Sequence, residues 1–94
     1  MRDRRDKEVI GGCVSTGDAS IITSDGEFSA SGAGGVTTIY LPKNFRILGI
    51  SGCGSCIFMV DTVTQNSFRI VTVNTVGGAA VAATVWFNVS GWRE

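Results

Sequence analysis

The sequence predicts an all-β protein: a small antiparallel β-sandwich, jelly-roll-like, built from about eight short strands. Three observations support this prediction. Val, Ile, Thr and Phe dominate from residue 9 onward, and these residue types favour strands. Turn-forming residues recur at short intervals, and no window of this region repeats its apolar residues with the helical period of about 3.6. The chain has 94 residues, which allows one domain.

Turn signals divide the chain into candidate strands. We expect the strands at residues 9–14, 19–23, 26–31, 35–41, 45–51, 56–64, 67–75 and 80–90. Asp25-Gly26 is a two-residue hairpin signal and predicts that the strands on either side of it pair with each other. Gln65-Asn66 is expected to turn the long strand 56–64 back along the strand that follows.

The last strand has the clearest pattern. Its apolar residues alternate onto one face, which we assign to the core: Val81, Ala83, Val85, Phe87 and Val89. The other face carries Ala82, Thr84, Trp86, Asn88 and Ser90. This second face is polar or small apart from Trp86, which is therefore a candidate for contact with another molecule.

Several other strands are apolar on both faces. The opposed sets are Ile57, Met59 and Val63 against Phe58 and Val60; Phe68 and Ile70 against Val71 and Val73; and Val36 and Tyr40 against Ile39 and Leu41. Strands of this kind are buried on both faces. A domain this small buries only about 60% of its unfolded surface, so it cannot cover all these faces itself. Either loops cover the rest, or copies of the chain or a partner do, and we favour self-association or a partner.

The interface expected from this excess uses five apolar positions. They are Phe58, Val71, Val73, Trp86 and Trp92. Trp86 has a second interpretation, because an outward tryptophan can also stack on a sugar ring.

Residues 1–8 differ in composition from the β-sandwich domain expected at residues 9–94. Every residue from position 2 to position 8 is charged, and both signs are present. The segment is therefore neither a polybasic nucleic-acid arm nor a signal peptide. It could form a helical cap, or it could be an arm that docks on another chain through Arg2, Arg4, Arg5 and Lys7.

The composition argues against several function classes. The chain has no histidine, which removes the commonest general base and metal ligand. Its acidic residues show no paired spacing, so we expect no enzyme activity. The formal net charge is zero, which gives no general attraction to nucleic acid or to an anionic membrane. No apolar run is long enough for a membrane-spanning helix.

Three cysteines are present, and two of them form the C-x-x-C step Cys53 to Cys56. This spacing occurs in redox pairs and in zinc sites. A redox pair favours a helix N-terminus, which is not expected here, and zinc would need ligands beyond Cys13 that the sequence does not offer. We therefore expect no metal or cofactor, and an odd number of cysteines fits a reducing compartment.

The order of the motifs resembles the small β-sandwich modules of bacteriophage virions, as found in tail-fibre tips, head fibres and decoration proteins. The segments that carry the resemblance are GEFSA at 26–30, GVTTIYLPKNF at 35–45, TQNSFRI at 64–70 and VWFNVSG at 85–91. The final half also resembles the H-type lectin sandwich. No metal-binding or sugar-binding signature of those lectins can be placed on residues of this chain.

The resemblance implies a non-enzymatic virion subunit, made in the host cytoplasm, that forms a homotrimer. Such a subunit would seal its interfaces with surface apolar residues and dock on a capsid or tail protein through residues 1–8. The alternative is a lectin-like module that binds a host-surface glycan in a shallow site. Trp86, Tyr40 or Trp92 would line that site with Asn and Asp neighbours.

Overall fold

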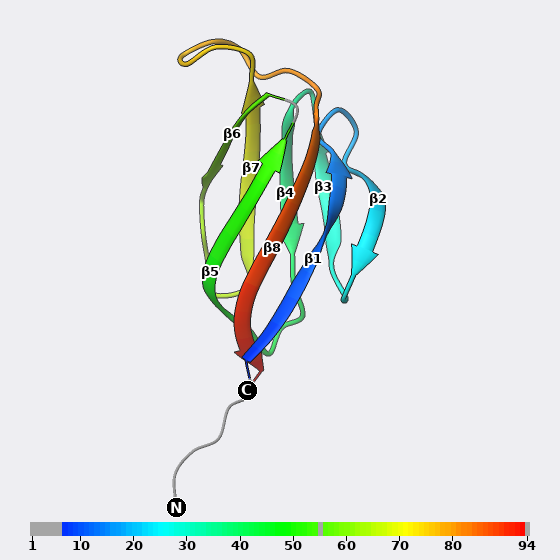
Figure 1. Ribbon diagram of the computed structural model, residues 1–94, viewed down its shortest axis with the longest axis vertical. Helices are drawn as coiled ribbons and strands as arrows, with labels where there is room; N and C mark the ends of the chain where they lie inside the picture. The colour runs from blue at the N-terminus through cyan, green and yellow to red at the C-terminus, as the bar shows by residue number, and fades with distance from the viewer. Residues whose placement is uncertain (1–6, 55, 94) are drawn as a thin grey trace, which may run out of the picture.

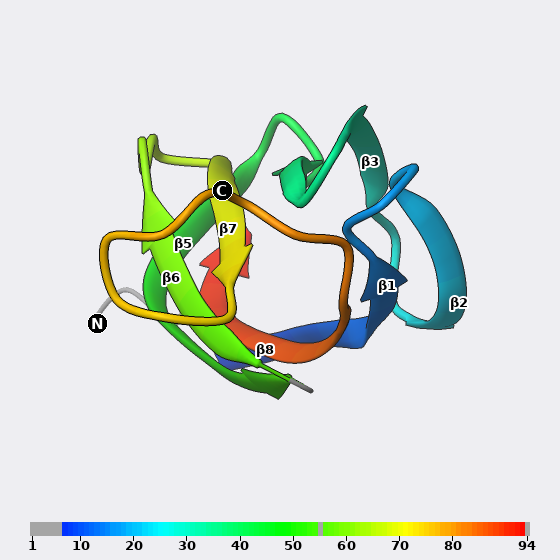
Figure 2. The same cartoon turned by 90° about the horizontal axis from the view of Figure 1, so that it is seen from above.

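The computed structural model describes residues 7–54 and 56–93, and within these residues it contains strands and no helix. Two four-stranded antiparallel sheets face each other (Figures 1 and 2). The front sheet of Figure 1 has the order β2-β1-β8-β5, and the back sheet has the order β3-β4-β7-β6. The front strands are β1 (Lys7–Ser15), β2 (Ser20–Asp25), β5 (Phe45–Gly54) and β8 (Thr84–Arg93). The back strands are β3 (Ser29–Ala33), β4 (Val36–Tyr40), β6 (Ile57–Asp61) and β7 (Ser67–Val73). The predicted all-β sandwich is confirmed.

The predicted hairpin at Asp25-Gly26 was wrong. β2 pairs with β1, and β3 pairs with β4, so Asp25-Gly26 is a corner at which the chain passes from the front sheet to the back sheet. Gly26 has a φ of 114°, a backbone conformation that a glycine adopts readily. The predicted return after Gln65-Asn66 is confirmed, because β6 and β7 pair antiparallel.

Phe87 of β8 lies at the centre of the core. The Phe28 and Phe68 rings pack edge-on against it, with ring centroids 5.1 Å and 5.7 Å away. Gly12 and Gly52 lie opposite Phe87 on the two neighbouring strands. A Cβ atom on Gly12 would lie 2.9 Å from the Phe28 ring, so the missing side chain makes room for this aromatic packing. The buried core cluster consists of Ile10, Val14, Ile39, Leu41, Phe45, Phe68, Ile70, Val85, Phe87 and Val89.

A buried threonine pair joins the two sheets at one end of the sandwich. The hydroxyl oxygens of Thr16 and Thr72 lie 2.7 Å apart. Thr72 also donates to the carbonyl of Val81, and the amide of Ala83 donates to Thr16. These bonds fix the segment between β7 and β8 as it passes over the end of the sandwich (Figure 2). The Val81 carbonyl and the Ala83 amide bond to these threonines, so residues 81–83 do not extend β8. β8 begins at Thr84, and the predicted start of that strand at residue 80 was too early.

β1 begins at Lys7, two residues earlier than expected. Lys7 lies opposite Trp92 on β8, and Arg93 forms an ion pair with Glu8 at 3.0 Å. The last two residues of the expected arm therefore belong to the sheet. Arg2, Arg4 and Arg5 lie outside the described residues.

Candidate interaction surfaces

Three of the interface residues predicted from the sequence lie on the back sheet, and they differ in how far they are buried. Phe58 is partly buried and packs against the core, so it belongs to the inner face of β6. Val73 is 2% exposed, and a bridge joins it to Ala80, so it offers no surface to a partner. Val71 points away from the core and is half-buried. Only Val71 of these three contributes to the outer surface.

An apolar row crosses the outer face of the back sheet. Pairing in register places Ala33, Val36, Val71 and Met59 side by side on the four strands. Met59 is 44% exposed, and Ile57, two residues before it on the same face of β6, is 36% exposed. We call these five residues the apolar row. Apolar residues aligned across a whole sheet are typical of a surface that contacts another protein.

An ion pair borders the apolar row. Arg69 donates to both carboxylate oxygens of Asp61, each at 2.7 Å. Hydrogen bonding from Arg69 lowers the pKa of Asp61, and the same bonds raise the pKa of Arg69. Both side chains are nearly half exposed, so the pair forms a charged margin beside the apolar surface.

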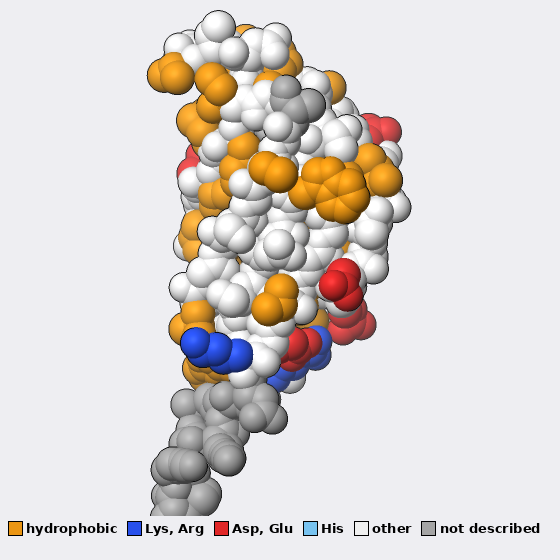
Figure 3. Space-filling view, in the orientation of Figure 1, with side chains coloured by type: hydrophobic (Ala, Val, Ile, Leu, Met, Phe, Trp, Pro, Cys, Tyr) orange, Lys and Arg blue, Asp and Glu red, His pale blue; other side chains and the backbone are white. Residues whose placement is uncertain are grey.

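The outer face of the front sheet mixes polar side chains with exposed apolar ones such as Val9, Leu48 and Trp86. On β8 this face carries Thr84, Trp86, Asn88, Ser90 and Trp92, because residues alternate between the two faces of a strand. Trp86 is 53% exposed, whereas Trp92 is half-buried between Lys7 and Arg46, its neighbours in register. Figure 3 shows white groups over the centre of this face, orange hydrophobic groups above and below them, and most of the charged groups at the lower end.

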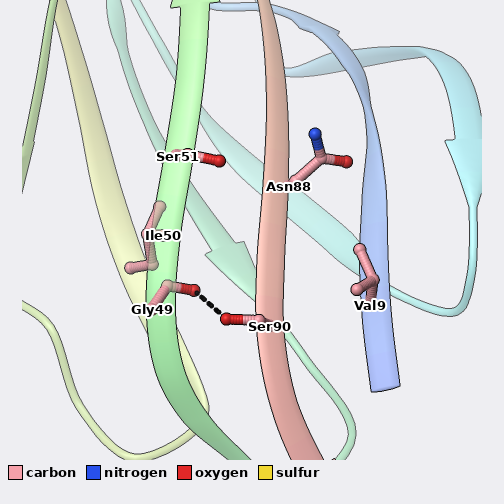
Figure 4. Close-up of a pocket in the computed structure, with 6 residues that line it drawn as sticks. All are labelled: Val9, Gly49, Ile50, Ser51, Asn88 and Ser90. Atoms are coloured by element: carbon pink, nitrogen blue, oxygen red, sulfur yellow. Dashed lines mark hydrogen bonds between the residues drawn. The ribbon is translucent and has the colours of Figure 1, made fainter. Parts of the chain in front are cut away.

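A shallow groove of about 520 Å³ lies on the front sheet, and two of its lining residues, Asn88 and Ser90, stand between Trp86 and Trp92 along β8. Its lining residues come from β1, β5 and β8 (Figure 4): Val9, Gly49, Ile50, Ser51, Asn88 and Ser90. The pairing of β5 with β8 shifts register between Ile47 and Gly49, so the groove lies beside an irregularity of the edge strand. Sequence reasoning identified Trp86 and Trp92 but missed the groove, because the lining residues are small and match no motif.

Tyr40 lies away from this groove. It is on β4 of the back sheet, exposed, beside a second and smaller hollow of about 220 Å³. The three aromatic residues considered for a glycan site therefore do not share one, since Trp86 and Trp92 lie on the front sheet.

The cysteines form no centre among the described residues. Cys13 is buried, Cys53 is exposed and Cys56 is partly exposed, and all three are free thiols. Burial raises the pKa of the Cys13 thiol. Within residues 7–54 and 56–93, no group of three or more His, Cys, Asp or Glu side chains is arranged to hold a metal ion. The same residues contain no helix long and apolar enough to cross a membrane.

No protein-family model, no curated protein and no solved structure matches this chain.

Proposed function

We propose that the protein is a non-enzymatic structural subunit of a bacteriophage virion: a capsid decoration, head-fibre or tail-associated protein that forms a homotrimer. The observation that carries the proposal is the apolar row on the outer face of the back sheet. The motif order of the sequence and the eight-stranded sandwich among the described residues support the comparison with virion modules. In such a jelly-roll-like sandwich, the outer sheet faces are the surfaces open to other subunits.

The apolar row gives the back sheet a surface that self-association would remove from water. A standard interface covers roughly 800 Å² on each partner, and the described chain has 5247 Å² of accessible surface. Burial of apolar surface contributes about 25 cal/mol for each Å² removed from water. The lost freedom of the partners and of interface side chains such as Met59 offsets part of this gain. The apolar row extends across all four strands of the back sheet and supplies apolar surface of this kind.

The second attachment that we propose uses the charged N-terminal segment. Arg2, Arg4, Arg5 and Lys7 would contact an acidic surface on a capsid or tail protein. The chain enters β1 of the front sheet at Lys7, at the end of the sandwich where Trp92 lies. The apolar row lies on the other sheet. Self-association and docking would then use separate parts of the molecule.

Mass spectrometry of particles purified on a density gradient, from cells that carry the gene, tests the virion assignment. We expect peptides of this chain in the particle fraction at a constant ratio to the major capsid protein. A variant that lacks residues 1–6 should leave the particle fraction and appear in the soluble fraction. Absence of the full-length chain from purified particles would contradict the proposal.

A lectin-like module is the second candidate function. The specific observation in its favour is the groove on the front sheet, whose lining residue Asn88 lies two residues from the exposed Trp86 on the same face of β8. The two functions are compatible, because the groove and the apolar row lie on opposite sheets.

A further inference from the structure

We propose that the groove on the front sheet binds an uncharged oligosaccharide that lies along β8, with one sugar ring on Trp86 and its hydroxyls on Asn88 and Ser51. This inference deepens the lectin-like candidate and does not depend on assembly through the back sheet.

The groove exists because its floor lacks side chains. Gly49 lies opposite Ser90, and Gly11 lies opposite Asn88. A Cβ atom on Gly11 would lie 2.4 Å from the Asn88 Oδ1, so the Asn88 side chain rests over this glycine. Figure 4 shows Ser51 and Asn88 on facing strands above the bond from the Ser90 hydroxyl to the carbonyl of Gly49. The result is an open groove whose volume of about 520 Å³ suits a small molecule.

The polar groups in the groove are available to a ligand. Within the described part of the chain, the Asn88 amide and the Ser51 hydroxyl have no hydrogen-bond partner. An asparagine side chain offers two hydrogen-bond donors and an acceptor, and a serine hydroxyl can both donate and accept a hydrogen bond. Adjacent sugar hydroxyls present the same mixture of donors and acceptors.

Trp86 supplies the apolar surface that a sugar ring needs. It lies two residues from Asn88 on the same face of β8, a distance of about 7 Å along the strand. Its ring is 53% exposed, and Cys13 and Cys53 flank it in register. A pyranose stacked on this ring would direct its edge hydroxyls towards Asn88. Trp92 lies further along the same face of β8, so several sugar units could follow the strand.

The lining of the groove favours a neutral ligand. None of its six lining residues is charged. A sialic acid or a phosphate would therefore meet no cationic partner among the residues that line the groove. The groove is also too polar for a purely apolar ligand, because desolvating the Asn88 amide without a hydrogen bond is unfavourable.

A glycan array followed by isothermal titration calorimetry tests the inference. The array should carry neutral hexose oligomers together with their sialylated forms. We expect binding to a neutral oligomer and weaker binding to its sialylated form. Trp86→Ala and Asn88→Ala should each weaken binding by roughly tenfold or more, as expected for the loss of one stacked ring or one hydrogen-bonding group.

Two further variants separate groove binding from other effects. Gly49→Val should abolish binding, because the larger side chain would fill the groove. The fold should tolerate the substitution, because a Cβ atom at position 49 would meet only the movable Ser90 hydroxyl, at 3.2 Å. Tyr40→Ala is the matched control, an exposed aromatic on the back sheet, and should bind like the wild type. Binding that survives both Trp86→Ala and Gly49→Val, or no binding to any neutral oligomer, would overturn the inference. Light-scattering masses of the same variants report separately on assembly.

Discussion

Met59 of β6 lies directly opposite Val71 of β7, and both side chains point away from the core of the sandwich. This pair forms the end of the apolar row at the edge strand β6. Met59→Asp should prevent self-association, because a carboxylate there would have to be desolvated in the interface. Light scattering should give the mass of a single 9.9 kDa chain for the variant.

The control for this substitution is Thr23→Asp, an exposed strand position on the front sheet. It introduces the same charge and should leave the assembly unchanged. Both substitutions are at exposed positions and should alter the free energy of unfolding of the monomer by no more than about 0.5 kcal/mol. Equal assembly masses for Met59→Asp and the wild type would remove the apolar row from the interface.

Thr72 and Thr37 are both fully buried and differ in hydrogen bonding. The Thr72 hydroxyl bonds to the Thr16 hydroxyl and to the carbonyl of Val81, whereas the Thr37 hydroxyl has no partner. Thr72→Val should lower the free energy of unfolding by about 1–3 kcal/mol, because it leaves buried groups unpaired. Thr37→Val should be neutral or stabilising by about 1 kcal/mol, because it removes an unpaired hydroxyl. Urea unfolding of the two variants measures the difference, and the opposite order would contradict the hydrogen-bond assignment.

The Asp61–Arg69 pair predicts a specific dependence of stability on pH. The pKa of Asp61 is lowered by its hydrogen bonds to Arg69, so the folded state favours the ionised carboxylate. The stabilisation is fully present above the unfolded-state pKa, about 3.9. It is lost as the pH falls through the lower folded-state pKa. Asp61→Asn should therefore be less stable than the wild type at neutral pH, and the difference should vanish in acid.

The control for the ion pair is the same substitution in an Arg69→Gln background. There the pH-dependent difference should become much smaller, because the main partner that lowers the pKa of Asp61 is absent and only the longer hydrogen bond from Thr62 remains. The difference at neutral pH should also shrink in high salt, since both side chains are exposed to solvent. A difference that persists in full in the Arg69→Gln background would assign it to another interaction.

The three thiols should react at different rates with a thiol reagent. Cys53 is exposed and should react first, followed by the partly exposed Cys56. Cys13 is buried and its pKa is raised, so it should react only when the protein unfolds. Mass spectrometry of labelled peptides under native and denaturing conditions reports the order. Early labelling of Cys13 would show that β1 separates from its neighbours in the native state.

The sequence was sufficient to predict the fold class and the inner face of the last strand. Val85, Phe87 and Val89 are buried and Trp86 and Asn88 are exposed, as their alternation indicated. Alternation of this kind is a local property, and it holds wherever a strand has one buried face.

The partners of each strand could not be predicted in the same way. Asp25-Gly26 has the local sequence of a hairpin, yet long-range pairing with β1 and β4 takes its two strands into different sheets. The two sides of β6 were also recognised as apolar, but the room that Gly52 leaves for the Phe58 ring is a tertiary property. Alternation alone therefore could not show that Phe58 faces the core and Met59 faces outward. The groove depends on Gly49, Ser51 and Asn88, which come together only through the register of β5 with β8.

Sedimentation equilibrium of the wild-type chain over a wide concentration range tests the central claim most directly, because it asks whether the apolar surface is covered by other copies. We predict a single species with three times the 9.9 kDa mass of the chain, dissociating only on dilution. A mass of one chain at every concentration would contradict the claim that this sandwich is built to associate with itself.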